Sequence, residues 1–597
     1  MSSSEPDDAL ELAIAMSLQR SPRVVSQQGN NATIDLTIAS SDDEEDEDLK
    51  QAIALSLQEP RQPTDNRAPL VSARFSSKHT SLAVSDYDGP ETSTSMDENT
   101  SSSGNVGMMG LDRKAMEDAR LARLGKRKRD VSPQRPSKHA VDRLRAFSST
   151  EDSNSKSYPS FACQYPLGTI KRTFAMRFPR TNDIRIDELL EADSLNIAVL
   201  SSFMWDADWL HTKLNPTKTK QIWVMNAKGR DIQQQWEQDM KASGVPNLKL
   251  HFPPMDGLIH SMHSKYMLLF SKHKLRIVVP TANMTRTDWG EVANDWQPGV
   301  MENTVFLIDL PRRADGRAGS VDSLSKFGRE LVHFLERQKI PQNVIDGVLK
   351  FDFSHTGHIA FVHSIGGVHD SASAHPTALP GLARAIVDLE LHDVQSIELD
   401  YASSSIGSLN NTLLRRIYLA ARGRQFTLDA SNADARKNIR IYFPTMATVE
   451  NSIGGPDCGG IITLTKQAYE AATFPQDCLR DYDSTRRGML SHNKLLFARG
   501  RACNGKPFAW VYVGSANLSE SAWGGQKILK SGKMGSLNIR NWECGVVIPV
   551  PSDKFTHVEF DEQGIPSMDV FKEMIEVPFH YPGQKYGDKQ PWHFKLR

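Results

Sequence analysis

Cysteine, net charge and long apolar runs are all scarce in this chain, and each shortage excludes a class of protein. Five cysteines occur among 597 residues, without a Cys-x-x-Cys pair, which argues against a disulfide framework and a structural zinc site. The net charge is -1, so nucleic acid would have to bind a local basic patch. No apolar run approaches the roughly 18 residues of a membrane span, and the polar N-terminus does not resemble a secretory signal. We therefore expect no membrane association, no metal and no cofactor.

Aromatic residues are also rare over residues 1–155, where Ser, Asp, Glu, Gln and Pro are frequent. A segment of this composition cannot bury enough apolar surface to offset its chain entropy. We expect residues 1–155 to form a disordered regulatory tail that precedes a globular region.

Two short segments of this tail match each other, at residues 5–20 and 43–59. Each has a Leu, an Ala three residues later and a Ser four residues after that, which places the three on one helix face. Acidic residues precede both, and the pattern resembles a ubiquitin-interacting motif, a helix that lies on an apolar patch of ubiquitin. The residues are Leu10, Ala13 and Ser17 in the first copy, and Leu49, Ala52 and Ser56 in the second. The alternative is a transient helix with a solvated acidic flank.

An alternating apolar segment lies between these copies, within residues 33–46. Ile34, Leu36 and Ile38 alternate with polar residues and precede an acidic run. This is strand periodicity, and it resembles a SUMO-interacting motif, in which an extended peptide adds to a sheet edge. The alternative is an apolar stretch without a partner.

A basic cluster spans residues 120–138, with the sequence KRKR at Lys126–Arg129. Such clusters direct proteins to the nucleus or contact nucleic acid without sequence preference. We expect a nuclear protein, and the alternative is a solvated, charged helix end.

From residue 156 onward, predicted strands alternate with predicted helices. Residues 194–205 are typical of a buried strand, and residues 230–244 have helical spacing that ends at Gly244, a suitable C-cap. This alternation predicts an α/β fold.

A His-x-Lys pattern followed by an Asn occurs twice in the same order. The asparagines lie in two matching segments, RIVVPTANMTRTDWG and WVYVGSANLSESAWG. The matched order indicates an internal duplication. We expect two similar α/β halves, residues 156–350 and 351–597, related by a pseudo-twofold axis with both sets at their interface. The sets are His263, Lys265 and Asn283 in the first half, and His492, Lys494 and Asn517 in the second.

These residue types suit chemistry at phosphorus. A histidine titrates near neutral pH, so one of a facing pair can attack while the other donates a proton to the leaving group. Lysine and asparagine side chains are fixed donors for the negative charge that develops on the phosphoryl oxygens. No carboxylate cluster has metal-ligand spacing, which favours chemistry without a metal.

The duplicated pattern resembles the phospholipase D superfamily. The usual superfamily motif has an Asp five residues after the Lys, where this chain has Phe270 and Arg499. The missing Asp is typical of the tyrosyl-DNA phosphodiesterase branch, and this resemblance covers the whole globular region. Three further segments share it, MWDADWL, YASSSIGSL and YGDKQPW, together with GSANLSESAWG of the second copy.

The resemblance implies an activity and a role for each residue of the two sets. It implies hydrolysis of DNA, single- or double-stranded, whose 3′ end is blocked by a tyrosine-linked topoisomerase I remnant or another group. His263 would be the nucleophile that forms a phosphohistidine, and His492 would be the proton donor. The lysines and asparagines would hold the nonbridging oxygens. No segment signals an oligomer, so we expect a monomer.

Each imidazole needs a partner that orients it. Glu543 precedes a strand after the second Asn, and Glu302 is expected at the equivalent point after the first, with Asn294 or Asn303 as alternatives. The serines that the resemblance implies as contacts to DNA phosphates are Ser405, Ser408 and Ser519. The alternative for each serine is a role in a turn or a helix cap.

Two other functions remain open at this point. The chain could be another superfamily member, a nuclease or a phospholipid hydrolase, although its sequence lacks a membrane-binding apolar surface. It could also be an adaptor that binds ubiquitin or SUMO around an inactive core. The intact His-Lys-Asn sets argue against the adaptor.

Overall fold

The computed structural model describes residues 163–291, 299–370, 373–426, 435–529 and 534–593. The expected tail with its ubiquitin, SUMO and nuclear motifs, and the candidate Asn294, lie outside these ranges. Within them, no helix combines the length and the apolar composition that crossing a bilayer requires.

The first half is built on an eight-stranded sheet with the order β2-β1-β10-β8-β7-β3-β4-β5. Strands β3, β4 and β5 are parallel neighbours, and helices α5 (Ala207–Lys213) and α6 (Arg230–Ser243) form the crossovers between them. The strands of this sheet are β1 Thr169–Thr173, β2 Asp183–Ile184, β3 Leu195–Ser201, β4 Lys220–Val224, β5 Leu248–His251, β7 Tyr266–Ser271, β8 Lys274–Pro280 and β10 Thr304–Pro311.

The second half is built on a sheet with the order β11-β21-β18-β17-β13-β14-β15. Helix α10 (Asn411–Ala421) is the crossover between the parallel strands β13 and β14. The strands of this sheet are β11 Ala360–Ser364, β13 Val394–Ser403, β14 Ile439–Phe443, β15 Leu479–Asp481, β17 Lys494–Ala502, β18 Pro507–Gly514 and β21 Asn541–Pro549.

The two sheets repeat one topology, which confirms the predicted pair of similar halves. Six consecutive strands match in order, β10-β8-β7-β3-β4-β5 with β21-β18-β17-β13-β14-β15. In both, the His-x-Lys precedes or begins the first strand of an antiparallel hairpin, β7–β8 or β17–β18, and the Asn follows the second strand. The duplicated sequence is therefore a duplicated structural unit.

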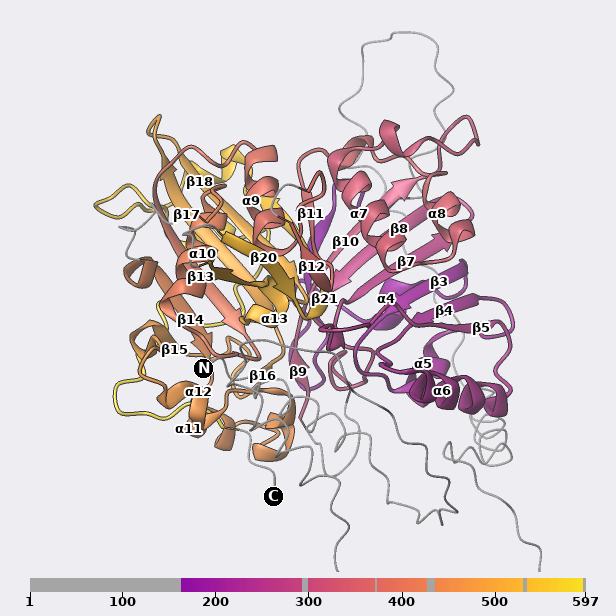
Figure 1. The fold of residues 1–597 in the computed structure, drawn as a ribbon, viewed down its shortest axis with the longest axis horizontal. Helices are drawn as coiled ribbons and strands as arrows, with labels where there is room; N and C mark the ends of the chain where they lie inside the picture. The colour runs from indigo at the N-terminus through magenta and orange to yellow at the C-terminus, as the bar shows by residue number, and fades with distance from the viewer. Residues whose placement is uncertain (1–162, 292–298, 371–372, 427–434, 530–533, 594–597) are drawn as a thin grey trace, which may run out of the picture. The chain divides into compact units, whose positions relative to one another are not determined.

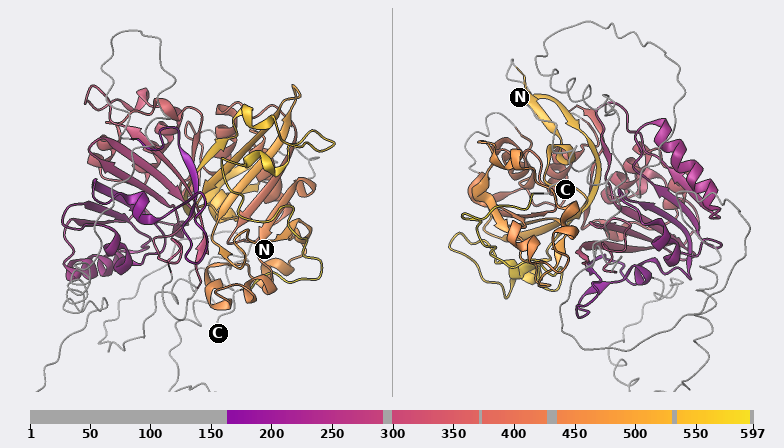
Figure 2. Two further views of the ribbon diagram at one scale, coloured as in Figure 1. Left: turned by 180° about the vertical axis from the view of Figure 1, so that it is seen from behind. Right: turned by 90° about the horizontal axis from the view of Figure 1, so that it is seen from below.

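Short parallel pairings join the halves. Strand β6 (Ser261–Met262) pairs with the start of β21, and β9 (Met301–Glu302) pairs with β16 (Leu490–Ser491). Figure 1 shows the two sheets meeting where β9, β16 and β21 lie, and Figure 2 shows them from behind and from below. One hydrophobic cluster contains apolar residues of both sheets, including Val279 of β8 and Val513 of β18. The interface is thus part of the core.

The elements outside the two sheets complete the described chain. A three-stranded sheet has the order β12-β20-β19, with bounds Gly367–His369, Met534–Ile539 and Gly525–Ile528. The other α-helices are α4 Ile186–Leu190, α7 Lys326–Arg337, α8 Gln342–Val348, α9 Ala378–Asp388, α11 Met446–Glu450, α12 Lys466–Glu470 and α13 Glu520–Trp523. The 3-10 helices are η2 Val321–Ser323, η3 Ser354–Thr356, η4 Ala435–Asn438, η5 Pro456–Ile461, η6 Gln476–Cys478, η7 Ser552–Phe555 and η8 Met568–Phe571.

Several local predictions are confirmed. The strand expected in residues 194–205 is β3, and the helix expected in residues 230–244 is α6. Gly244 is its C-cap with φ 63°, a left-handed conformation that favours glycine. The division at residue 350 falls between β10, the last strand of the first sheet, and β11, the first strand of the second. As a domain boundary, it stays a prediction.

At the two positions where the superfamily has Asp, this chain has residues that pack or form ion pairs. Phe270 packs in the core with its ring 6.0 Å from that of Phe351. Arg499 is 3% exposed, and its guanidinium lies 2.8 Å from Glu398 and 3.1 Å from Asp400. Neither residue has a carboxylate of its own, so any orienting carboxylate at the site must come from elsewhere in the chain.

Candidate active site

The histidine of the first half follows β6 directly and is held by the second half. The backbone N–H of His263 donates to the carbonyl of Trp542 over 3.0 Å, and its Nδ1 lies 2.9 Å from Oε2 of Glu543. Only 3% of His263 is exposed. Because a carboxylate only accepts hydrogen bonds, Nδ1 carries the proton of the neutral ring and Nε2 keeps its lone pair. Nε2 is therefore the atom available for reaction.

The histidine of the second half is held by the first half in the same way. The backbone N–H of His492 donates to the carbonyl of Glu302 over 2.9 Å. Its Nδ1 lies 3.1 Å from Oδ2 of Asp288, and 4% of the residue is exposed. Here too the carboxylate at Nδ1 leaves Nε2 as the reactive atom.

Each lysine is fully buried and bonded to the histidine of its own motif. Nζ of Lys265 donates to the carbonyl of His263 over 2.9 Å, and Nζ of Lys494 donates to the carbonyl of His492 over 2.5 Å. An ammonium has three donors. Each lysine therefore keeps donors for an anion placed between the two histidines.

The two asparagines are oriented by equivalent backbone contacts. Oδ1 of Asn283 accepts from the N–H of Met204 over 3.3 Å, and Oδ1 of Asn517 accepts from the N–H of Ser405 over 3.2 Å. Since the carbonyl oxygen of each amide faces a backbone donor, the Nδ2 group is the part that can donate to a ligand.

The two His-x-Lys motifs lie at the interface of the halves, where each histidine contacts the opposite half. Oγ1 of Thr281 lies 3.3 Å from Oδ1 of Asn493, which links the two halves directly. The positive charge of Lys494 contributes to lowering the pKa of His263, and Lys265 does the same for His492. Burial lowers the pKa of Lys265 and lowers that of Lys494 well below its usual value, so an anion bound between them would favour their charged ammonium forms.

The buried environment keeps both imidazoles neutral. Burial lowers the pKa of His263 to about 4, with Glu543 opposing the effect and Lys265 adding to it. Burial, followed by the charge of Lys494, lowers the pKa of His492 to about 3. Burial also lowers the pKa of Lys265 to about 8. At neutral pH the free site therefore holds two histidines with free Nε2 lone pairs.

The two orienting carboxylates are themselves fixed. Glu543 accepts from Oγ of Ser515 over 2.5 Å and from Nδ2 of Asn541 over 3.1 Å. Asp288 accepts from the backbone N–H of Asn283 over 2.6 Å. Although burial alone would raise it, the pKa of Asp288 is lowered, because His492 and the Asn283 N–H stabilise the anion. Both carboxylates can therefore stabilise an imidazolium that forms during a reaction.

The structure contradicts the prediction that the side chain of Glu302 orients an imidazole. Oε2 of Glu302 accepts from Oγ of Ser484 over 2.7 Å, and its carboxylate lies beside Arg172 and Arg486. The carboxylate that contacts Nδ1 of His492 belongs to Asp288. Glu543, by contrast, contacts the imidazole of the first half as predicted.

The strand register explains this error. Val305 pairs with Pro280, and Gly545 pairs with Gly514, so Val305 and Gly545 are equivalent. Two residues before this pair, Asn303 is equivalent to Glu543. Three residues before it, Glu302 is equivalent to Trp542. A slip of one residue turns a side chain to the opposite face.

Asn303 occupies the Glu543 position but does not orient the imidazole. Its Oδ1 accepts from Oγ1 of Thr281 over 2.8 Å, as Glu543 accepts from Ser515, and its Nδ2 donates to the carbonyl of Asp288 over 3.2 Å. Asn303 thus supports the loop that carries Asp288.

Asp288 is the functional residue that the sequence reasoning missed. It lies within TRTDWG, where the second copy has SESAWG and places Ala522 at the matching position. The sequence contains one signal for this residue: a charged side chain stands opposite an alanine in two copies that otherwise match. A buried carboxylate that occurs in only one of two matched copies is a candidate for a functional role.

The three predicted DNA-contact serines lie on the second half. Oγ of Ser405 lies 2.6 Å from Oγ1 of Thr463, and Oγ of Ser519 caps α13 by accepting from the N–H of Ala522. Ser408 is exposed. Ser519 therefore has the cap role given above as the alternative, and contact of the serines with DNA stays a prediction.

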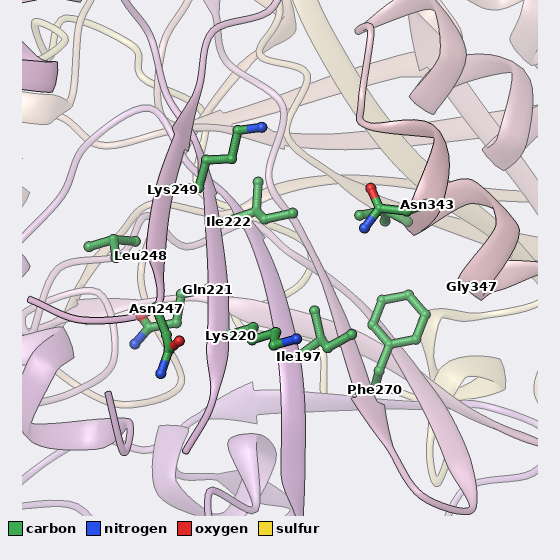
Figure 3. Close-up of a pocket in the computed structure, with 11 residues that line it drawn as sticks. Ile197, Lys220, Gln221, Ile222, Asn247, Leu248, Lys249, Phe270, Asn343 and Gly347 are labelled. Carbon is green, nitrogen blue, oxygen red and sulfur yellow. The ribbon is translucent and has the colours of Figure 1, made fainter. Parts of the chain in front are cut away.

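A pocket of about 370 Å³ lies away from these residues, between the sheet of the first half and α8 (Figure 3). Ile197, Ile222 and Phe270 line its sheet side, with Lys220 and Lys249 near them. Its lining residues, all within the described chain, include none of the predicted site residues. Across the described ranges, no three His, Cys, Asp or Glu side chains are grouped so that they could hold a metal ion.

The duplicated sheet and the paired His-Lys-Asn sets define a protein with the phospholipase D fold. A family model described as tyrosyl-DNA phosphodiesterase matches residues 170–587, more than half of the chain. The chain therefore belongs to the tyrosyl-DNA phosphodiesterase family.

Relatives with this name occur in plants and animals. Tyrosyl-DNA phosphodiesterase 1 of Arabidopsis thaliana is 27% identical over 390 residues, which cover 62% of this chain and 60% of the relative. The Drosophila melanogaster protein of that name is 27% identical over 296 residues, which cover 48% of this chain and 49% of the relative. The matches thus span about half to three fifths of these relatives.

Solved structures share the fold. A crystal structure of a mutant yeast tyrosyl-DNA phosphodiesterase aligns with a TM-score of 0.52 at 17% identity, over 72% of this chain and 99% of the yeast chain. A second yeast mutant structure aligns with a TM-score of 0.51. At this identity the likeness supports the architecture of two phospholipase D-like halves.

The tail also matches a family model. A model described as ubiquitin interaction motif matches residues 7–19 and 44–60, which overlap the two predicted copies. The tail therefore carries two ubiquitin interaction motifs. The SUMO-interacting segment and the basic nuclear signal stay predictions.

Proposed function

We propose that this protein hydrolyses the phosphodiester bond between a tyrosine and the 3′ end of DNA, as left by topoisomerase I, and also removes other 3′ blocking groups. The observation that carries this proposal is the pair of His–carboxylate contacts, His263–Glu543 and His492–Asp288, each built across the two halves. Family membership and the buried lysines that favour a phosphate anion support it.

In the first step, Nε2 of His263 attacks phosphorus and the bond from phosphorus to the tyrosine oxygen breaks. The phenol has a pKa near 10 when free, so a proton from His492 makes it a better leaving group. The 3′-phosphoryl DNA is then joined to Nε2 of His263, and the Glu543 carboxylate stabilises the positive charge on that ring.

In the second step, Nε2 of His492 takes a proton from water, and the water oxygen attacks phosphorus. The bond from phosphorus to Nε2 of His263 breaks, which releases DNA with a 3′-phosphate and restores the protonated His492. Asp288 holds the imidazole of His492 in one orientation for both proton transfers.

The lysines and asparagines stabilise charge on the phosphoryl oxygens. Lys265 and Lys494 each keep ammonium donors, and Asn283 and Asn517 present Nδ2 groups. Donors fixed in a buried site stabilise the transition state without reorganising. This set needs no metal ion for the reaction as written.

The substrate itself prepares His492 for proton donation. In the free site, burial and Lys494 lower the pKa of this ring and keep it neutral. A bound phosphodiester places a negative charge between the lysines and the ring, which raises the pKa of His492. The proton donor is thus formed when substrate binds.

The tail extends this function to modified substrates. The ubiquitin interaction motifs support binding of ubiquitin, and the segment at residues 33–46 supports binding of SUMO. A nuclear enzyme that binds these modifiers through its tail is delivered to protein–DNA adducts that carry them. It acts on DNA as a monomer.

The test uses the full-length protein and an oligonucleotide with a 3′-phosphotyrosine, in EDTA, with the His263→Ala variant alongside. We expect wild type to produce the 3′-phosphate and His263→Ala to produce none. Conversion by both proteins, or by neither although wild type is folded and binds the oligonucleotide, would overturn the proposal. Loss of conversion in EDTA alone would refute the metal-free mechanism.

A further inference from the structure

Trp542 and Glu302 occupy equivalent positions behind the two histidines. The carbonyl of Trp542 accepts from the N–H of His263 over 3.0 Å, and the carbonyl of Glu302 accepts from the N–H of His492 over 2.9 Å. Both belong to the short parallel pairings that join the halves, β6 with β21 and β9 with β16. Each histidine is therefore placed by the main chain of one residue in the opposite half.

The side chains of Trp542 and Glu302 anchor these residues by different kinds of contact. Nε1 of Trp542 donates to the carbonyl of Pro254 over 2.9 Å, and its ring centroid lies 5.9 Å from that of Phe334. Glu302 is a fully buried acid that accepts from Ser484 over 2.7 Å. The residue whose carbonyl contacts His263 is thus anchored by an aromatic side chain, and the residue whose carbonyl contacts His492 is anchored by a charged one.

The charge of Glu302 belongs to a buried network of both halves. Its Oε1 lies 3.6 Å from Nη1 of Arg172 and 3.9 Å from Nε of Arg486. Both arginines are more than nine-tenths buried. Arg486 also donates to the carbonyl of Thr173 over 2.8 Å. Ser484 and Arg486 come from the segment just before β16, so the network joins β9 to the segment that leads into His492.

The segment that carries these contacts is short. The backbone N–H of Arg486 donates to Oγ of Ser484 over 3.0 Å, and β16, which follows it, leads directly into His492. A shift of Glu302 would move its own carbonyl, which contacts His492. Through Ser484 and Arg486, it would also move the segment that precedes His492.

We infer that Glu302 is a positioning residue for His492, acting through its main-chain carbonyl and its ion pairs with Arg172 and Arg486. This inference rests on the proposed function, in which His492 donates a proton and then activates water. Glu302 therefore controls the proton-transfer steps, and the attack by His263, which is placed by Trp542, does not depend on it.

The test compares two substrates in single-turnover reactions. One oligonucleotide carries a 3′-phosphotyrosine, and the other a 3′-(4-nitrophenyl phosphate), whose leaving group departs without a proton. For Glu302→Gln we expect phosphotyrosine cleavage to fall about 10- to 100-fold, because displacing the proton donor removes part of the roughly 10²- to 10⁴-fold that positioned proton transfer contributes. The first release of nitrophenolate should change by less than about 3-fold, and a covalent DNA adduct should accumulate because its hydrolysis needs His492.

Two further variants complete the design. Glu302→Asp keeps the charge and should recover part of the phosphotyrosine activity. Trp542→Phe removes the hydrogen bond to Pro254 behind His263. It should slow the cleavage of both substrates by similar factors, and no covalent DNA adduct should accumulate. If Glu302→Gln does not fold, Ser484→Ala, which removes one hydroxyl and no charge, should show the same adduct.

The outcomes separate this inference from the proposed function. Wild type that cleaves neither substrate contradicts the proposed function. Active wild type, with Glu302→Gln and Ser484→Ala slowed equally on both substrates and without adduct, contradicts the positioning role and makes Glu302 a structural residue only. Unchanged activity in both variants contradicts it as well.

Discussion

Oδ2 of Asp288 lies 3.1 Å from Nδ1 of His492, although the two residues are 204 positions apart in the sequence. The contact pairs a carboxylate of the first half with a histidine of the second. It corresponds to the contact between Glu543 and His263, in which the second half supplies the carboxylate. Both imidazoles are thereby fixed with Nε2 available.

Replacing Asp288 by Asn should impair the proton donor selectively. The amide cannot stabilise the imidazolium form of His492, and it permits the wrong tautomer. We expect cleavage of a 3′-phosphotyrosine to fall on the order of 100-fold. The release of nitrophenolate in a single turnover should fall much less.

The Glu543→Gln variant is the matched comparison for Asp288→Asn, because it removes the carboxylate beside the nucleophile. It should slow both substrates by similar factors. An Asp288→Asn variant that cleaves phosphotyrosine at the wild-type rate would show that the contact has no catalytic role.

The His492→Asn variant should trap the covalent intermediate. Without a base to activate water, the phosphohistidine at His263 would persist after an activated substrate has reacted. A denaturing gel with labelled oligonucleotide should show a protein–DNA band, and the double variant His263→Ala/His492→Asn should show none. A folded His492→Asn variant that forms no band would refute the assignment of roles.

Stability should fall in mild acid because both site histidines resist protonation in the folded state. Burial lowers the pKa of His263 to about 4 and that of His492 to about 3. The unfolded chain has histidines that titrate near 6.5, so between these values it binds more protons than the folded chain. The free energy of unfolding therefore rises with pH from about 3 to about 6.5, and the contribution of these two histidines is lost as the pH falls through that range.

This prediction is checked by urea unfolding of the full chain at pH 7 and pH 5. The decrease in the free energy of unfolding from pH 7 to pH 5 should be smaller in the His263→Asn/His492→Asn variant than in wild type, by at least about 1 kcal/mol. An equal loss in the variant and in wild type would mean that other groups dominate the acid sensitivity.

The ubiquitin interaction motifs should bind ubiquitin without contributing to hydrolysis of a short oligonucleotide. Ala13 and Ala52 stand where a small side chain lets a helix approach its partner closely. Substitution of both by Arg should abolish chemical-shift changes in labelled ubiquitin, while turnover of a 3′-phosphotyrosine oligonucleotide stays at the wild-type rate. Binding that persists in the double variant would place the contact elsewhere.

The sequence contains most of the site because the chain repeats itself. His263, Lys265 and Asn283 recur as His492, Lys494 and Asn517 with the same order and the same flanking strands. Two copies with matched spacing restrict the topology, since each His-x-Lys must lead into a hairpin that ends at the Asn. The repeated strand order of the two sheets follows from the same duplication.

The orienting carboxylates can be predicted only in part. Glu543 is found by its place after the second Asn, but the same reasoning in the first half selects Glu302 in place of Asn303. The segments between the closing Trp-Gly and the next long strand differ in length in the two halves, which hides the register until the partner of Pro280 is known. Asp288 contacts a histidine of the other half, and such a contact leaves no spacing pattern in the sequence.

Because each histidine takes its carboxylate from the other half, neither half carries a complete His–carboxylate pair. A single half, expressed alone, would be inert, and activity should return only when both polypeptides reassociate. The two copies differ at paired positions of the site, where Asp288 stands opposite Ala522 and Glu302 stands opposite Trp542.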